Sequence, residues 1–145
     1  MSATVTVRTM PGRKLACEVD DGRHQWIADE PPDDGEDIGP NPYGLLLASL
    51  GSCVAMTLVL YARRKGWPLE GVTVQSRHAR HEEPLADGSG ARRWQEIVRD
   101  IDLAGDLDDA QRARLLEIAG RCPVTRTLQG ELVIVDVLAA GQPEF

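Results

Sequence analysis

The chain has 145 residues, of which 42% are hydrophobic and 27% are charged, a composition typical of one globular domain and not of a disordered tail or a multidomain assembly. Only 4% of the residues are aromatic, so stacking platforms for single-stranded nucleic acid are not expected. Sixteen basic residues against 23 acidic ones give a formal charge of -7, which would repel a phosphate backbone and excludes nucleic acid as a natural partner.

The N-terminal part of the chain has the pattern of an antiparallel meander. Apolar and polar residues alternate over 4–7 and 15–19, a third short run follows at 23–28, and Pro-Gly and Asp-Gly turn signals separate the runs. The first residues already follow a strand pattern and resemble neither a signal peptide nor a transit peptide. The expected location is therefore the cytoplasm.

The segment 29–40 interrupts this pattern with three prolines, two glycines and six acidic residues. Such a composition favours turns and solvent exposure over packing. We therefore predict an acidic, solvated loop within the domain. We favour a mobile linker over a binding loop for this segment.

A long apolar helix is predicted next. Asn41 can cap a helix that begins at Pro42, because proline at the first helical position loses no hydrogen bond. Residues 43–62 carry no charge, and three cations followed by Gly66 indicate the end of the helix. Such a run could span a bilayer, but its small polar residues and the strands around it favour a buried helix without membrane contact. A chain of this size has little material to cover that helix, which implies a second subunit.

The C-terminal half is predicted to contain a hairpin, a helix and a last strand. Alternating runs at 72–78 and 94–103 indicate two strands, joined by a turn at 87–90. An apolar stripe over 110–120 indicates a second helix. The valine-rich segment 131–138 has the composition of a strand.

The three cysteines, Cys17, Cys53 and Cys122, are too few for a disulfide framework. No metal site is expected, because the sequence has no CxxC or HExxH spacing and its three histidines are scattered. A glycine-rich phosphate loop is not found either. Cys17 falls on a predicted strand with no motif around it, and we interpret it as a packing residue.

Cys53 and Cys122 are the candidates for chemistry. Cys53 lies midway along the uncharged helix between small residues, which leave room for a ligand, although an inert buried thiol is an open alternative. Cys122 precedes Pro123, which we expect to end the second helix and to fix the thiol near Arg126. That arginine would stabilise a thiolate, unless it is only an exposed charge. The two cysteines are 69 positions apart, so only the fold can bring them together.

Two motifs resemble those of the OsmC/Ohr family of thiol-dependent hydroperoxide reductases. The first covers residues 39–57, with the sequence GPNPYGLLLASLGSCVAMT, and continues at 61–70 as YARRKGWPLE. The second is the helix that follows Gly-Asp-Leu at 105–107 and ends in Arg-Cys-Pro-Val at 121–124. The resemblance covers nearly the whole chain and is nearest to the branch of the family with an Asn-Pro-Tyr motif.

The resemblance implies an α+β fold and an intertwined homodimer. In the family, six-stranded antiparallel sheets wrap two long central helices, and two active sites lie at the subunit interface. The whole chain, 1–145, would then be a single OsmC-like domain that includes the acidic loop at 29–40.

The resemblance also implies a reaction. Cys53 would attack the O–O bond of an organic hydroperoxide and become a sulfenic acid, and Cys122 would resolve it to a disulfide. An external dithiol, lipoyl-type or a small thiol, would reduce the pair again. No cofactor is implied.

A family arginine in the turn after the first strand stabilises the thiolate and orients the peroxide. Arg13 fits that position best, and Arg8 and Arg23 are weaker candidates. The family glutamate that braces this arginine is missing, since Tyr43 and Gly44 stand there. Three consequences are open: an arginine that is free to swing, an arginine held by an acidic residue of the 29–37 segment, or weak peroxidase chemistry.

The missing glutamate also keeps a second function open. In this alternative the chain is a non-catalytic domain that binds a hydrophobic small molecule at the apolar interface, or that senses the redox state through its cysteines. The presence of both cysteines in the two family motifs favours the peroxidase.

Overall fold

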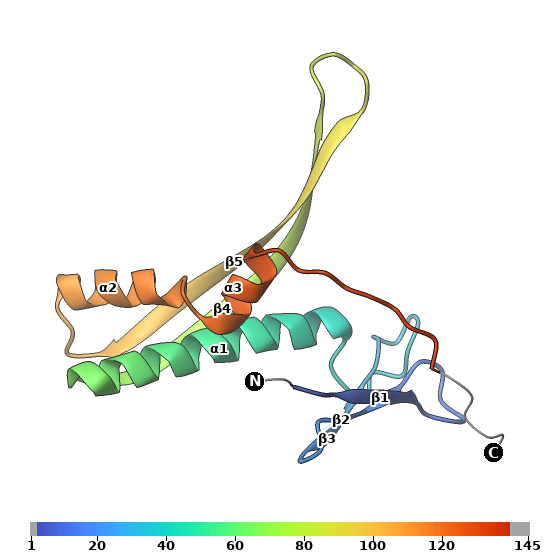
Figure 1. Cartoon of the computed structure of the whole chain (residues 1–145), viewed down its shortest axis with the longest axis horizontal. Helices are drawn as coiled ribbons and strands as arrows, with labels where there is room; N and C mark the ends of the chain where they lie inside the picture. The colour runs from blue at the N-terminus through green and yellow to red at the C-terminus, as the bar shows by residue number, and fades with distance from the viewer. Residues whose placement is uncertain (1–2, 140–145) are drawn as a thin grey trace.

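The computed structural model describes residues 3–139. Over these residues the chain is an α+β fold with a long helix and antiparallel sheets, as predicted (Figure 1). The described residues form one three-stranded and one two-stranded sheet, and not the six-stranded sheet that the resemblance implied for the dimer. In chain order the elements are β1 (Thr6–Thr9), β2 (Cys17–Asp20), β3 (Gln25–Ala28), α1 (Pro42–Lys65), β4 (Leu69–Pro84), β5 (Ala91–Gly105), α2 (Asp109–Ala119) and α3 (Pro123–Gln129).

The N-terminal meander is confirmed. β1 pairs with β2 and β2 with β3, both antiparallel. The register places Val7 opposite Val19 and Val19 opposite Trp26, so these apolar side chains share one face of the sheet. Val19 is buried, but Val5 and Val7 are exposed. The sheet therefore carries an apolar face that this chain covers only in part.

The acidic loop is more ordered than its composition indicated. The Asp29 side chain is 3% exposed and accepts hydrogen bonds from the backbone N–H groups of Glu30, Glu36 and Ile38. The backbone N–H of Asp29 also donates to the Pro40 carbonyl, 3.1 Å away, which closes the loop. The expectation of a segment that does not pack is thus wrong at Asp29, because one carboxylate satisfies several backbone donors that water would otherwise bind.

Replacement of Asp29 by asparagine is expected to destabilise the protein and to remove part of its acid sensitivity. Burial raises the pKa of the Asp29 carboxyl, but the N–H groups of Glu30, Ile38 and Glu36 outweigh burial and hold the pKa below its ordinary value. A lowered folded-state pKa means that this stabilisation is present above the unfolded pKa and is lost as the pH falls through the folded one. Urea unfolding at neutral and acidic pH measures the difference. Equal pH profiles for the two proteins would contradict the prediction.

Helix α1 begins and ends as predicted. The Asn41 side chain accepts from the Gly44 N–H at 2.8 Å, and Gly66 ends the helix with a left-handed φ of 68°. Its buried residues recur every four positions and face β4, α2 and α3; they are Leu50, Val54, Leu58 and Ala62. By length and composition α1 could also cross a membrane.

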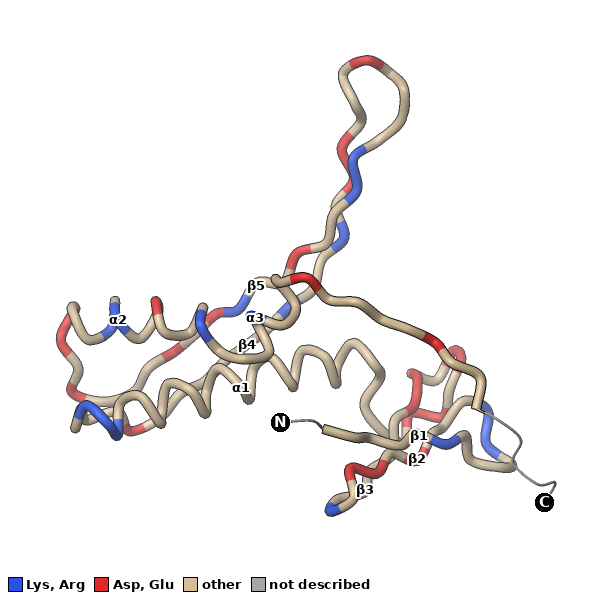
Figure 2. The backbone as a smooth tube through the Cα atoms, viewed as in Figure 1, with Lys and Arg blue, Asp and Glu red and all other residues tan. Residues whose placement is uncertain are grey.

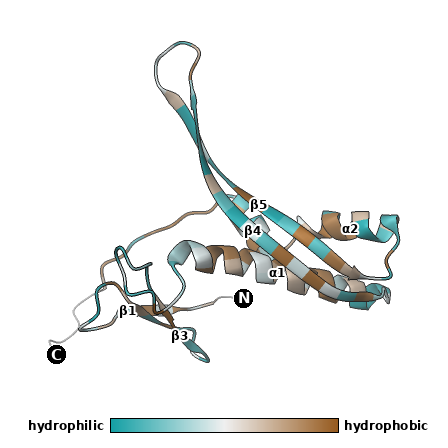
Figure 3. Cartoon of the chain, turned by 180° about the vertical axis from the view of Figure 1, so that it is seen from behind, coloured by the Kyte–Doolittle hydropathy of each residue, from teal (hydrophilic) through white to brown (hydrophobic). Residues whose placement is uncertain are grey.

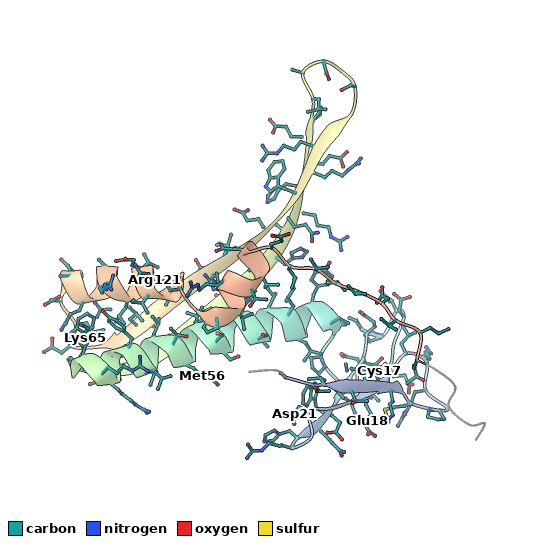
Figure 4. The ribbon with its side chains drawn as sticks, viewed as in Figure 1. Cys17, Glu18, Asp21, Met56, Lys65 and Arg121 are labelled. Atoms are coloured by element: carbon teal, nitrogen blue, oxygen red, sulfur yellow. The ribbon has the colours of Figure 1, made fainter. Side chains whose placement is uncertain are left out.

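The opposite face of α1 is exposed. It consists mainly of small or apolar residues, namely Ala48, Ser49, Ser52, Met56 and Leu60. Met56 is 65% exposed and lies on the side of the helix away from α2 (Figure 4). Figure 3 shows that α1 is apolar along most of its length. The helix is thus covered on one side only.

The predicted hairpin is confirmed and is longer than the alternating runs indicated. β4 and β5 pair in continuous register from Val72 opposite Leu103 to Pro84 opposite Ala91. The turn closes with a 2.9 Å hydrogen bond from the Leu85 N–H to the Gly90 carbonyl. One half of the hairpin packs on α1, whereas the half near the turn projects away from all three helices (Figure 1).

The second helix is confirmed with a capping box. The Asp108 side chain accepts from the Gln111 N–H at 2.7 Å, and the Gln111 side chain accepts from the Asp108 N–H at 2.9 Å. The expectation that Pro123 only ends this helix is incomplete. Pro123 is the first residue of α3, a helix that we did not predict, because proline at that position costs no helical hydrogen bond.

The last predicted strand is wrong for the single chain. Residues 131–138 form no strand, and the segment runs without a sheet partner over the described residues. Its apolar side chains are exposed, among them Ile134, Val137 and Leu138. A strand needs an edge to pair with, and within this chain no edge reaches the segment.

The main core lies where α1, α2 and the β4–β5 hairpin meet. Its fully buried side chains are Val54, Leu58, Leu115 and Cys122. Tyr61 and Trp67 pack against them in an edge-to-face pair with ring centroids 5.5 Å apart. One of the two candidate cysteines is therefore part of the core.

Candidate active site at Cys53 and Cys122

Cys53 lies midway along α1, next to the buried stripe of that helix. It is half-buried and packs against the core cluster that contains Val54, Leu58 and Cys122. The helix holds the side chain at a fixed position between the core and the exposed face of α1. A small molecule that reached this thiol would therefore approach from outside the core.

Cys122 is placed differently from our expectation. It does not sit at a corner after α2 but caps the N-terminus of α3, and its side chain is completely buried. The Thr125 N–H donates to the Cys122 Sγ at 3.4 Å, and the Thr125 Oγ1 lies 2.8 Å from the same sulfur. The sulfur thus has two polar neighbours from one residue.

The fold brings the two thiols together. Cys53 packs against the core cluster that contains Cys122, where α1 meets α3, and its thiol is near enough to lower the pKa of Cys122. Both are free cysteines, and both belong to the same packed cluster. The sequence separation left their proximity open, and the packing of α3 on α1 provides it.

Several groups act on the pKa of Cys122. Burial raises it, because a thiolate loses solvation in an apolar core, but the Thr125 hydroxyl and N–H, the Cys53 thiol and the charge of Arg99 together hold it below the ordinary value. The expected neighbour, Arg126, is an exposed residue of α3 and is not the cation that acts on this sulfur. The cation is Arg99, on β5, which donates to the Thr125 Oγ1 at 2.7 Å.

Arg13 lies in the turn after β1, as predicted, and is held by a carboxylate. Its Nη1 forms an ion pair with Glu36 at 2.9 Å, and the Lys14 N–H donates to the other oxygen of Glu36 at 3.1 Å. Of the three consequences left open, the structure shows the one in which an acidic residue of the 29–37 segment holds the arginine. Within residues 3–139, none of the hydrogen bonds or ion pairs of Arg13 reaches Cys53 or Cys122.

The Lys14 N–H and the Arg13 guanidinium lower the pKa of the Glu36 carboxyl. Glu36 is therefore charged at neutral pH and gives Arg13 a permanent partner. The sequence could not single out Glu36 among the six acidic residues of the loop, because the selection depends on how Asp29 folds the loop toward β2. The two weaker candidates for the family arginine, Arg8 and Arg23, are both exposed.

Tyr43 replaces the missing glutamate with a different contact. Its ring stacks on His78 with centroids 4.6 Å apart, and its hydroxyl accepts a 3.3 Å hydrogen bond from Arg80. Tyr43 thus ties the first turn of α1 to β4. Tyr43 is thus a structural contact, and the carboxylate that faces Arg13 comes from the preceding loop.

The histidines are engaged separately. His78 contacts Gln95 at 2.7 Å, and His81 contacts Glu96 at 2.9 Å. Over the described part of the chain, no three histidine, cysteine or acidic side chains gather closely enough to hold a metal ion. The candidate site is therefore built from thiols and their hydrogen-bond partners.

Two pockets matter for this site. An apolar pocket of about 630 Å³ separates the β1–β3 sheet from the exposed face of α1, and its walls include Cys17, Trp26 and Ser52. A second pocket, of about 270 Å³, is lined by Arg99 and Thr125, the two residues that form the polar side of Cys122. The first pocket is lined by residues of the β1–β3 sheet and of α1, and the second by residues of α1, β5 and α3.

The sequence model of one protein family, described as OsmC-like protein, matches residues 34–135. This range includes both candidate cysteines and excludes Arg13. No curated protein matches the chain.

Several solved structures share the fold. The OsmC-like protein of Mycoplasma pneumoniae is 22% identical, with 90% of this chain and 89% of that chain covered and a TM-score of 0.71. An organic hydroperoxide resistance protein from Legionella pneumophila is 20% identical, with 91% and 92% covered and a TM-score of 0.60. A putative organic hydroperoxide resistance protein from Vibrio cholerae, with captopril bound in one of its active sites, is 17% identical, with 91% and 87% covered and a TM-score of 0.60.

Proposed function

The chain belongs to the family of OsmC-like proteins, and we propose that it is a thiol-dependent peroxidase that reduces organic hydroperoxides. The observation that carries the proposal is that Cys53 packs against the core cluster that contains Cys122, so that the two thiols belong to one packed group. Two of the solved structures with this fold are described as organic hydroperoxide resistance proteins. A pair of adjacent thiols supplies the two electrons that reduction of a peroxide requires.

The proposed reaction has three steps. The Cys53 thiolate attacks one oxygen of ROOH; an S–O bond forms, the O–O bond breaks, and RO⁻ leaves as the alcohol after taking up a proton. The Cys122 thiolate then attacks the sulfur of the Cys53 sulfenic acid; an S–S bond forms, and hydroxide leaves as water with a second proton. An external dithiol, lipoyl-type or small, returns two electrons by exchange and leaves as its own disulfide.

We assign Arg13 to the peroxide side of this reaction. A guanidinium favours the thiolate and the developing alkoxide, because both carry negative charge. Its ion pair with Glu36, at 2.9 Å, holds the side chain in place. Arg13 does not reach Cys53 within one chain, so the assignment requires either movement of the β1–β2 turn or a second subunit.

We propose that the second subunit is another copy of this chain. One exposed face of α1, the apolar face of the β1–β3 sheet and the unpaired segment 131–138 are all uncovered, and the apolar pocket of about 630 Å³ lies between the first two. The small residues Ala48, Ser49 and Ser52 on α1 would let the α1 helix of a partner approach closely. The projecting half of the hairpin and the unpaired segment would then find sheet edges on the partner.

The function is tested by thiol counting and intact mass before and after one equivalent of cumene hydroperoxide. We expect rapid loss of two of the three free thiols and a mass decrease of about 2 Da, the two hydrogens lost when a disulfide forms. Restoration of both thiols by dihydrolipoamide would support an external dithiol as the reductant of the disulfide. Unchanged thiols would overturn the peroxidase and favour the domain that binds a hydrophobic small molecule.

A further inference from the structure

Arg99 and Thr125 form a chain of hydrogen bonds that ends on the Cys122 sulfur. The Arg99 Nη1 donates to the Thr125 Oγ1 at 2.7 Å, and that oxygen lies 2.8 Å from the Cys122 Sγ. The three residues come from β5 and from the start of α3. Thr125 is 4% exposed and Cys122 is fully buried, so the contact between the hydroxyl and the sulfur is shielded from solvent.

The guanidinium determines which atom donates in each of these hydrogen bonds. Arginine has only donors, so the Thr125 oxygen must accept from Arg99 and its own hydrogen must point elsewhere. The other polar atom recorded at this hydroxyl, over the described residues, is the Cys122 sulfur. If the thiol donated instead, the buried Thr125 hydroxyl hydrogen would lose its partner, which is costly. The sulfur thus receives both the hydroxyl and the N–H of Thr125.

On these contacts, and on the function proposed above, we propose that Arg99 and Thr125 are positioning residues that keep Cys122 as a buried thiolate. Neither residue touches the peroxide. Arg99 acts through Thr125, and Thr125 presents two donors to a sulfur that apolar packing alone would keep protonated.

The pair serves the reaction in both directions. When Cys53 is a sulfenic acid, a thiolate at Cys122 is the form that attacks it. When the disulfide is reduced, an external thiol reaches the half-buried Cys53 and not the fully buried Cys122. The mixed disulfide then forms on Cys53, and Cys122 leaves as the thiolate that Thr125 and Arg99 stabilise.

The test isolates Cys122 in a Cys17→Ser, Cys53→Ser background, where it is the only thiol. The ultraviolet absorbance of the thiolate is followed against pH. Arg99→Leu and Thr125→Val are expected to move the titration midpoint upward, and Arg99→Lys and Thr125→Ser to restore it in part. Arg126→Ala is the matched control, an exposed arginine on the same short helix, and is expected to leave the midpoint unchanged.

A kinetic measurement complements the titration in the chain with all three cysteines. After one equivalent of cumene hydroperoxide, Arg99→Leu is expected to slow disulfide formation by on the order of tenfold, and the Cys53 sulfenic acid should accumulate. An unchanged titration midpoint in Arg99→Leu would overturn the proposal. If Thr125→Val does not fold, the Arg99→Leu titration is sufficient as the test. Because the titration needs no peroxide, failure of the peroxidase and failure of the Arg99–Thr125 pair give different results.

Discussion

Cys53→Ser is expected to abolish the reduction of organic hydroperoxides, with a loss in kcat/KM on the order of 10³-fold or more. A serine hydroxyl is almost fully protonated at neutral pH and is a poor nucleophile toward an O–O bond, whereas a thiolate attacks it readily. Cys53 is the half-buried member of the thiol pair, so it is the one that a peroxide can reach. Peroxide consumption with dihydrolipoamide as the reductant measures the loss.

Cys122→Ser should give a contrasting result. This variant is expected to consume one equivalent of peroxide per chain and then to stop as a trapped Cys53 sulfenic acid, because the second sulfur is missing. Cys17→Ser is the control, since Cys17 lies on β2 and its thiol donates to the Leu15 carbonyl at 3.4 Å. If the sulfenic acid formed on Cys122 in Cys53→Ser instead, the assignment of the two roles would be reversed.

The local signals of the sequence predicted most of the fold. Asn41, Pro42 and Gly66 give the limits of α1 because capping depends on neighbouring residues only. The hairpin and the meander follow from alternation and turn residues in the same way. The segment 131–138 shows the limit of this reasoning, since its composition is that of a strand but, over the described residues, it pairs with neither of the two sheets.

The sequence predicts the two cysteines of the candidate site but not the residues that surround them. The family motifs predict Cys53 and Cys122 as the two thiols, and their placement in one packed group depends on the unpredicted helix α3, which Cys122 caps. Arg99 lies 26 positions before Thr125 and has no motif around it, so no signal in the sequence connects the two. Arg126, the nearer choice along the chain, points to solvent because α3 turns its side chain away from the core.

The charged residues lie mostly outside α1, the helix that carries Cys53. Acidic residues gather in the 29–40 loop and basic residues at the end of α1, and most of α1 has neither (Figure 2). The two arginines of the proposed mechanism therefore come from other elements, Arg13 from the β1–β2 turn and Arg99 from β5. Residues near Cys53 in the sequence therefore could not indicate which cations lie near the site.

Met56→Glu is expected to convert the dimer that we propose into monomers. Met56 is 65% exposed in the single chain, and in the dimer it would lie against the α1 helix of the partner. Two symmetric carboxylates in that contact lose solvation without a cationic partner, which should raise the dissociation constant by at least about 100-fold. Sedimentation velocity measures this change as a shift toward the 15.8 kDa mass of one chain.

Leu116→Glu is the matched control for this prediction. Leu116 is 64% exposed and lies on α2, which packs on the other side of α1 from Met56, so the same charge there should leave the dimer intact. A wild-type protein that sediments as a monomer would contradict the dimer directly. Association of the wild type with lipid vesicles, lost in Met56→Glu, would instead favour a membrane surface as the cover of α1. A dimer that survives in Met56→Glu would mean that the exposed stripe of α1 faces something other than its copy.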